Sequence, residues 1–171
     1  RQEELTLNPK ADYLHFTSNN TIFGTEWDEE PVSGRVPLVG DISSNAFSKP
    51  IDVSKYGLIY AGAQKNLGAA GVTLVLLRDD LLSRSPDTLP AMLNYNTHSK
   101  GHSAYNTPPV FSIYILGLVV KWLLDQGGLE KMADQNEDKA KLLYDQLEAS
   151  EFYRGHALQG NRSRMNVTFN L

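Results

Sequence analysis

Hydrophobic residues in the first half of the chain fall in short runs that are separated by polar or glycine-containing segments. Short runs rich in β-branched, aromatic and leucine residues are typical of β-strands. The pattern predicts four strands, over residues 13–17, 36–41, 57–62 and 72–77. The fourth run is apolar at almost every position, which predicts a strand that is buried on both faces.

The second half of the chain is predicted to be mainly helical. After a short helical turn at 78–82, residues 83–101 hold two prolines and several small polar residues, which predicts an irregular surface segment. Pro108 and Pro109 then open a helix that ends at the glycine pair 127–128. This helix is apolar on nearly every side, so we expect it to be buried between layers.

A second helix is predicted over residues 129–149, because its mostly apolar positions recur at spacings of three and four. Those positions are Leu129, Met132, Ala133, Asn136, Ala140, Leu143 and Leu147. The remaining positions are mainly charged and predict a solvated face. Residues 165–171 alternate between apolar and polar side chains, which predicts a final strand.

The number of predicted helices is too small for an all-parallel sheet. Parallel neighbours need crossover connections, which are usually helices, yet residues 42–56 show no helical periodicity and residues 65–71 form a tight loop. Either the sheet is partly antiparallel, or elements outside this chain cover it.

Composition narrows the classes of function. The 171 residues allow one domain, or one domain with part of another, and 41% hydrophobic residues supply a core. The formal net charge of −4 argues against nucleic acid as the main partner. The sequence holds no cysteine, which excludes a disulfide scaffold and a thiol nucleophile in this chain and fits a reducing compartment.

The sequence shows no sign of a membrane protein or of a secretory leader. Residues 110–124 are the most apolar stretch, but a helix over them would reach only roughly 22 Å, short of the ~30 Å of a bilayer core. The polar start at residues 1–4 is not followed by the apolar segment of a signal peptide.

Two residues at predicted strand ends suggest chemistry. Lys65 follows the third strand among small residues, where desolvation would free its amine as a nucleophile, although an ordinary loop lysine is the simpler interpretation. Asp41 ends the second strand, where α/β sheets bind ligands, although an Asp that starts a turn is common. Together they are what a pyridoxal phosphate site needs: a lysine for the Schiff base and a carboxylate that keeps the pyridine nitrogen protonated.

Specific motifs strengthen this interpretation. They include Ala-Gly-Ala-Gln-Lys-Asn over 61–66 and Asn-Thr-Pro-Pro over 106–109. With these motifs, the chain resembles phosphoserine aminotransferases, which have the aspartate-aminotransferase fold. The resemblance covers essentially the whole chain, and its matching segments are residues 18–24, 41–45, 48–57, 60–66, 105–109 and 161–167.

The resemblance implies a role for each matching residue. Lys65 is expected to bind the cofactor covalently, with Asp41 on the ring nitrogen and Thr21 on the hydroxyl side of the ring. Gln64 is expected to bind the cofactor phosphate. Asn106 and Thr107 match a pair that reaches the cofactor phosphate of the neighbouring subunit, which implies a homodimer with shared sites, although the pair also suits a cap before the helix at Pro108.

The resemblance further implies an α/β chain, part of the large domain of a fold type I pyridoxal-phosphate transferase with the beginning of the small C-terminal α+β domain. The expected division is 1–126 and 127–171. Because the family enzymes are about twice as long, the chain is expected to be truncated and inactive alone.

The expected reaction of the parent is cytoplasmic and belongs to serine biosynthesis. An amino group moves between glutamate and 3-phosphohydroxypyruvate, giving phosphoserine and 2-oxoglutarate. Two alternatives stay open: another class V pyridoxal-phosphate enzyme, such as a cysteine desulfurase, and a non-catalytic fragment that mediates assembly only.

Other candidates have simpler explanations. His98 and His102 have a spacing seen in helical metal sites, but they lie in a loop-like region, so no metal site is predicted. Arg162 and Arg164 are able to bind a substrate anion, although a charged entrance to the last strand is the simpler interpretation.

Overall fold

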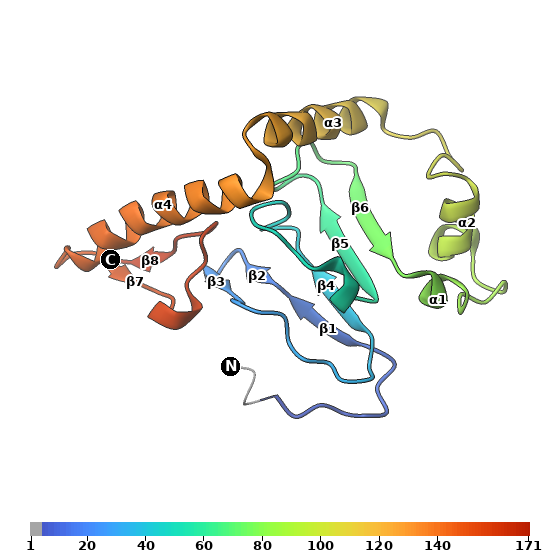
Figure 1. Cartoon of the computed structure of the whole chain (residues 1–171), viewed down its shortest axis with the longest axis horizontal. Helices are drawn as coiled ribbons and strands as arrows, with labels where there is room; N and C mark the ends of the chain where they lie inside the picture. The colour runs from blue at the N-terminus through green and yellow to red at the C-terminus, as the bar shows by residue number, and fades with distance from the viewer. Residues whose placement is uncertain (1–4) are drawn as a thin grey trace.

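A computed structural model of the chain describes residues 5–171 and is built around a four-stranded sheet (Figure 1). The strand order is β1-β4-β5-β6, and the strands are β1 (Leu14–Thr17), β4 (Leu38–Asp41), β5 (Leu58–Gly62) and β6 (Thr73–Leu77). The four predicted strands are therefore confirmed. The polar start at residues 1–4 lies outside the described residues.

The sheet is mixed, as the shortage of helices suggested. Strands β1, β4 and β5 are parallel, whereas β6 runs antiparallel to β5. The expectation of a partly antiparallel sheet is confirmed. The tight loop at residues 65–71 is possible because an antiparallel neighbour needs no crossover.

The two faces of the sheet differ in burial because side chains alternate along each strand. One face carries the core residues Phe16, Leu38, Ile59 and Ala61, each at most 7% exposed. The other face is partly or fully exposed among the described residues. It carries His15, Thr17, Asp41 and Tyr60, as the strand register requires.

Strand β6 does not fit the expectation of burial on both faces. Thr73 and Leu76 are exposed, and Leu76 retains 44% of its accessible surface. The prediction was wrong because β6 is an edge strand, with β5 as its only neighbour among the described residues.

The core lies between the buried face and the loops that cross it. Its buried members are Phe16, Leu38, Ile42, Ala46, Tyr56, Ile59, Ala61, Ala63 and Leu67. Tyr56 stacks on Phe16 at 6.1 Å between ring centroids. Gly40 makes this contact possible, because a Cβ at its position would lie 2.7 Å from the Tyr56 ring.

Short elements connect the strands. A small antiparallel pair, β2 (Asn19–Asn20) and β3 (Thr25–Glu26), follows β1, and a one-turn 3-10 helix at Val53–Lys55 precedes β5. After β6 come α1 (Asp79–Leu82), a 3-10 turn at Ala91–Leu93 and α2 (Tyr95–Lys100). The helical turn at 78–82 is confirmed.

The segment 83–101 is not wholly irregular, because it contains α2. The Asn94 side chain caps this helix by accepting a hydrogen bond from the backbone N–H of Asn96 at 2.9 Å. An asparagine cap of this kind stabilises a helix whose sequence, Tyr-Asn-Thr-His-Ser-Lys, has little helical propensity. The prediction for this segment was therefore wrong over α2.

Two long helices follow, α3 (Val110–Asp125) and α4 (Gly128–Glu148), and meet at 85°. The bend occurs at Gly127 and Gly128, both in positive-φ conformations (101° and 82°) that glycine adopts without strain. No single helix of the described residues is long and apolar enough to cross a membrane, and only the bent pair passes such a test, by length and composition alone.

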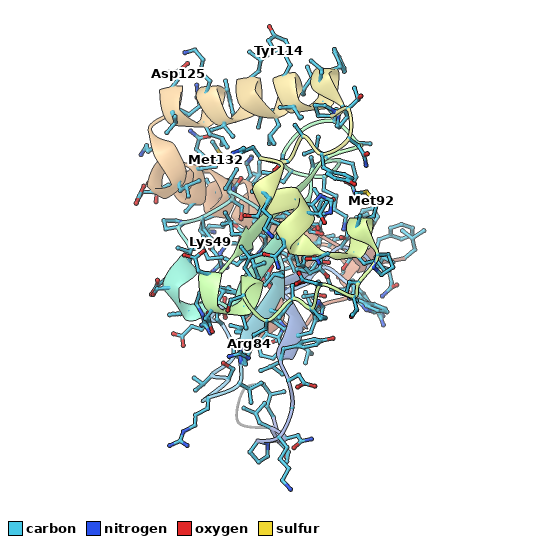
Figure 2. The ribbon with its side chains drawn as sticks, turned by 90° about the vertical axis from the view of Figure 1, so that its right-hand side faces the viewer. Lys49, Arg84, Met92, Tyr114, Asp125 and Met132 are labelled. Atoms are coloured by element: carbon cyan, nitrogen blue, oxygen red, sulfur yellow. The ribbon has the colours of Figure 1, made fainter. Side chains whose placement is uncertain are left out.

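Helix α3 is not buried between layers, so that expectation was wrong for this chain. Of its residues only Leu123 is buried, whereas Phe111, Tyr114 and Trp122 are more than half exposed. One side contacts the loop after β5, where Ser112 Oγ donates to the Ala70 carbonyl at 2.7 Å. The opposite side meets solvent in the part of the chain that the structure describes (Figure 2).

Helix α4 keeps the predicted stripe with one correction. Met132, Asn136 and Ala140 are buried, but Leu143 is 53% exposed and Tyr144 is buried in its place. The Tyr144 hydroxyl donates to the Ser163 carbonyl at 2.9 Å, which draws this side chain inward.

The C-terminal segment forms a small antiparallel pair, β7 (Arg154–Gly155) and β8 (Phe169–Asn170), with a 3-10 turn at Gln159–Asn161 between them. The predicted strand at 165–171 is therefore much shorter than expected. Its first residues turn instead, because the backbone N–H groups of Met165 and Asn166 both donate to Ser163 Oγ, at 3.0 and 2.9 Å.

Candidate active site

Lys65 is the centre of a polar cluster at the carboxyl end of β5. Its Nζ donates to Thr21 Oγ1 at 2.6 Å and to Ser44 Oγ at 2.8 Å. The two hydroxyl groups are also hydrogen-bonded to each other at 2.5 Å. Ser44 is buried while Lys65 is exposed. The two hydroxyl groups therefore hold the lysine amine in place while the side chain remains open to a ligand.

The sheet brings these groups together. Strands β4 and β5 are parallel neighbours, so the residues after their carboxyl ends share one edge of the sheet. Asp41 is the last residue of β4, and its Oδ1 accepts a hydrogen bond from the backbone N–H of Ser43 at 2.9 Å. Ser43 Oγ in turn accepts from the backbone N–H of Gly62 at 2.9 Å, which ties the loop to β5.

Thr21 reaches the cluster from the turn between β2 and β3. Asn20 Oδ1 accepts hydrogen bonds from the backbone N–H groups of Ile22 and Phe23, both at 3.1 Å, and so fixes the turn. Gly24 completes it with a φ of 62°. Thr21 was predicted from the resemblance, whereas Ser44 was given no role. The only feature of the sequence that points to Ser44 is that it follows a second serine, Ser43.

Gln64 lies directly beside the cluster in sequence and is exposed. Its side-chain amide covers Gly62, because a Cβ there would lie 2.7 Å from Gln64 Oε1. The amide therefore lies at the same sheet edge as Asp41 and Lys65.

Asn106 and Thr107 do not join the Lys65 cluster through any hydrogen bond among the described residues. Both are exposed and precede α3, and Asn106 Nδ2 contacts the Met92 sulfur at 3.0 Å. They face outward from this chain, where the expectation of a role in a neighbouring subunit stays a prediction.

The donor set of the cluster fits an aldehyde cofactor with a ring nitrogen. A lysine amine condenses with an aldehyde, a carboxylate pairs with a protonated ring nitrogen, and a hydroxyl hydrogen-bonds a phenolic oxygen. Lys65, Asp41 and Thr21 supply these three groups on one exposed sheet edge. Among residues 5–171, no group of three or more His, Cys, Asp or Glu side chains is placed to hold a metal ion.

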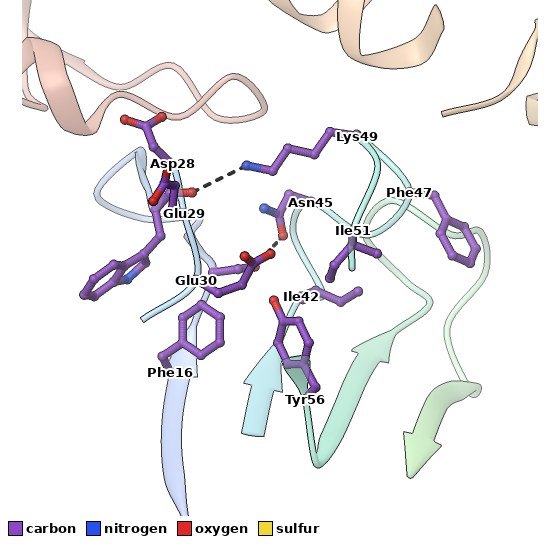
Figure 3. Close-up of a pocket in the computed structure, with 12 residues that line it drawn as sticks. Phe16, Asp28, Glu29, Glu30, Ile42, Asn45, Phe47, Lys49, Ile51 and Tyr56 are labelled. Carbon is purple, nitrogen blue, oxygen red and sulfur yellow. Dashed lines mark hydrogen bonds between the residues drawn. The ribbon is translucent and has the colours of Figure 1, made fainter. Parts of the chain in front are cut away.

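A small cavity elsewhere does not compete with this site. It measures about 30 Å³ and lies against the buried face of the sheet, between Phe16, Ile42 and Tyr56 (Figure 3). That volume holds one or two water molecules and not an aromatic cofactor.

The other candidates occupy structural positions. Arg164 pairs with Glu137, Asp28 and the buried Glu26, and Arg162 pairs with Glu148 at 2.6 Å. These ion pairs favour the simpler interpretation of a charged strand entrance. His98 lies in α2, and its Nε2 is 3.2 Å from the Met92 carbonyl oxygen in the preceding 3-10 turn, whereas His102 lies beyond the end of α2.

Comparison with known proteins identifies the class first. The chain belongs to the aminotransferase class-V family, which matches residues 2–171. Within that family it is similar to the phosphoserine aminotransferase of Herpetosiphon aurantiacus, with 53% identity over 99% of this chain and 48% of the relative. The chain thus spans about half the length of the curated relatives it matches.

Solved structures of phosphoserine aminotransferases are also similar to this chain. Phosphoserine aminotransferase from Bacillus circulans subsp. alkalophilus superposes with a TM-score of 0.97 at 49% identity, over 100% of this chain and 48% of that one. A PLP-bound phosphoserine aminotransferase from Trichomonas vaginalis gives a TM-score of 0.93 at 36% identity, over 99% and 50%. The α/β fold of class V pyridoxal-phosphate enzymes, expected from the sequence, is confirmed.

Proposed function

We propose that the protein is a pyridoxal-phosphate-dependent aminotransferase that moves an amino group between glutamate and 3-phosphohydroxypyruvate, giving phosphoserine and 2-oxoglutarate. The observation that carries this proposal is the Lys65 amine, held by Thr21 and Ser44 beside the carboxyl end of the Asp41 strand. The high identity to phosphoserine aminotransferases supports the choice of substrates.

Each predicted site residue at this sheet edge has a task in this proposal. Pyridoxal phosphate supplies an electron sink for the pair of electrons that the substrate carbon releases. Lys65 would hold the cofactor covalently, and its amine would move a proton at that carbon. Asp41 keeps the ring nitrogen protonated, Thr21 orients the ring hydroxyl, and Gln64 binds the phosphate.

The arrangement in the cell is proposed with the activity. Asn106 and Thr107 would bind the cofactor phosphate of a second subunit, so the working form is a homodimer with shared sites. The exposed position of both residues supports this assignment. We also propose a division into a cofactor domain, residues 1–126, and the start of a C-terminal domain, residues 127–171. The sharp bend between α3 and α4 at Gly127 supports this division. The proposed location of the protein is the cytoplasm.

The test uses the full-length gene product. After incubation with pyridoxal phosphate and reduction with borohydride, peptide mass analysis is expected to find the cofactor on Lys65. Lys65→Ala abolishes both the label and the transfer of nitrogen from glutamate to 3-phosphohydroxypyruvate. Lys139→Ala, on the charged side of α4, is the matched control and retains both.

Three results would contradict the proposal. Label on another lysine would overturn the assignment of Lys65. Sulfur release from cysteine without turnover of phosphoserine would point to the desulfurase alternative. A full-length protein that binds no cofactor and turns over neither substrate would favour a part in assembly only, to which the exposed apolar side of α3 is suited.

A further inference from the structure

A chain of polar side chains runs behind Asp41 on the exposed face of the sheet. Asp41 on β4 lies directly opposite Tyr60 on β5 in the parallel register. The Tyr60 hydroxyl is hydrogen-bonded to His15 Nε2 at 3.0 Å, and the two rings stack at 6.0 Å. His15 belongs to β1, on the far side of β4, so the contact bridges two strand spacings, roughly 10 Å.

The chemistry of these three side chains determines which of them donates a hydrogen bond and which accepts it. Burial raises the pKa of Tyr60, and the neighbouring negative charge of Asp41 and a hydrogen bond to it raise the pKa further. Tyr60 is therefore a neutral hydroxyl at physiological pH, able to donate its proton toward Asp41. Its oxygen then accepts from His15, which requires the proton of the imidazole on Nε2.

The Asp41 carboxylate is fixed from two sides by this arrangement. The backbone N–H of Ser43 holds Oδ1 from the loop side, at 2.9 Å. Tyr60 is the residue opposite Asp41 on β5, and a hydrogen bond to the Asp41 side chain is one cause of its raised pKa. A backbone donor on one side and a tyrosine hydroxyl on the other restrict the rotation of the carboxylate, which is the usual role of groups behind a charged ligand-binding side chain.

We propose that Tyr60 and His15 are positioning residues that orient the Asp41 carboxylate toward the ring nitrogen of the cofactor. This inference rests on the proposed function, because Asp41 needs orientation only if a ring nitrogen faces it. Neither residue touches the reacting atoms. Their effect passes through the carboxylate and changes how firmly the ring nitrogen keeps its proton.

The surroundings of Tyr60 leave few other groups to explain such an effect. The titratable side chains that act on it are Asp41 from β4, His15 from β1 and, more weakly, Tyr95 from α2. A change of the cofactor spectrum in a Tyr60 variant is therefore traced to the carboxylate, provided that the Tyr95 variant is measured in parallel.

The experiment compares five variants of the full-length gene product loaded with pyridoxal phosphate. Tyr60→Phe removes only the hydroxyl, His15→Phe keeps a stacking ring but removes the donor, and His15→Gln restores an N–H donor. Tyr13→Phe, at a tyrosine that is 58% exposed, is the matched control, and Tyr95→Phe tests the remaining neighbour. Two properties are measured: cofactor affinity, and the pH midpoint of the visible absorbance of the lysine-bound cofactor.

Tyr60→Phe is expected to weaken cofactor binding by about three- to tenfold, the effect of losing one hydrogen bond of ordinary strength that acts on the cofactor only through the carboxylate. The absorbance midpoint moves upward by roughly half a pH unit, because a ring nitrogen that loses its proton more easily no longer lowers the pKa of the adjacent imine. His15→Phe shifts it in the same direction by less, His15→Gln returns it toward the parent value, and the other two variants leave it unchanged. A purely structural role would not move this midpoint.

The outcomes separate the two proposals. Parent protein that fails to bind the cofactor at Lys65 overturns the proposed function and this inference with it. Parent protein that binds the cofactor normally, with Tyr60→Phe and His15→Phe titrating like the Tyr13→Phe control, leaves the function standing and overturns the role of Tyr60 and His15. Circular dichroism identifies any variant that has lost its fold, and His15, being exposed, provides the variant least able to disturb the core.

Discussion

Glu26 provides the sharpest test of how the sheet region and the C-terminal segment are held together. Its side chain is 1% exposed. Lys49 Nζ lies 3.2 Å from the carboxylate, Asn45 Nδ2 donates to it at 3.2 Å, and the backbone N–H of Arg164 donates at 3.0 Å. We predict that Glu26→Ala destabilises the fold strongly, because it leaves buried donors without an acceptor.

The magnitude follows from the donors. Each hydrogen bond to a buried charged acceptor contributes about 1.5–3 kcal/mol, and those from Asn45 and Arg164 are largely shielded from water. The Lys49 side chain is 32% exposed, so its ion pair is discounted for solvent screening. The expected loss is about 3 kcal/mol of unfolding free energy for Glu26→Ala. Glu26→Gln retains one acceptor oxygen and loses roughly half of that.

Thermal unfolding of the 171-residue chain, followed by circular dichroism, measures the effect. For a chain of this size, about 3 kcal/mol corresponds to a fall in Tm of roughly 6–12 °C. Glu29→Ala is the matched control, because Glu29 is exposed and only three residues away, and an exposed site of this kind changes stability by at most about 0.5 kcal/mol. Equal Tm values for the two alanine variants would refute the reasoning.

Three further predictions concern the site and the core. Ser44→Ala removes one acceptor of the lysine amine, so cofactor affinity, measured by absorbance titration of the full-length gene product, falls by about threefold to tenfold, and unchanged affinity would count against its role. Gly40→Ala places a Cβ 2.7 Å from the Tyr56 ring and lowers the unfolding free energy by about 1–3 kcal/mol, measured by urea denaturation, and an unchanged unfolding free energy would count against this packing. Burial raises the pKa of Glu30, but the hydrogen bond and the charge of Lys55 outweigh burial, and the net pKa is lowered. The Glu30–Lys55 pair therefore stabilises the fold above pH 4.5, and this contribution is lost as the pH falls below 4.5. The urea midpoints of the parent and of Lys55→Met therefore converge below pH 4.5, and a gap that stays constant with pH would contradict the assignment.

Elements set by local pattern were predicted well. The four strands of the sheet and helices α3 and α4 follow from apolar runs and from 3.6-residue periodicity. Helix α2 was missed because its stability comes from the Asn94 cap and not from an apolar stripe. The last strand was overestimated because Ser163 Oγ captures two backbone N–H groups that alternation alone would assign to a ladder.

Burial was predicted less well, because it depends on neighbours that a local pattern does not contain. An apolar helix predicts a cover on every side, yet α3 exposes Phe111 and Trp122 in this chain. The chain spans about half the length of the curated relatives it matches.

Apart from the resemblance, the sequence predicted only those site residues that combine a chemically reactive side chain with a position at the end of a predicted strand. Lys65 and Asp41 stand out because a reactive amine and a carboxylate follow neighbouring strands. Tyr60 and His15 gave no such signal, since 45 positions separate them and each fits an ordinary strand residue. Their contact exists because β1 pairs with β4 rather than β5, and strand order is not encoded in periodicity.

The two faces of the sheet separate stability from chemistry, and neighbouring residues make this separation measurable. Gly40 faces the core, where a larger side chain strains the packing of Tyr56. Tyr60, opposite Asp41 on the next strand, faces the exposed side, where loss of its hydroxyl leaves the core contacts intact. Gly40→Ala should therefore change unfolding while the bound cofactor keeps its spectrum, and Tyr60→Phe should change the spectrum while unfolding stays nearly constant. Such a crossed pair of effects is expected only if one face of the sheet builds the fold and the other binds the ligand.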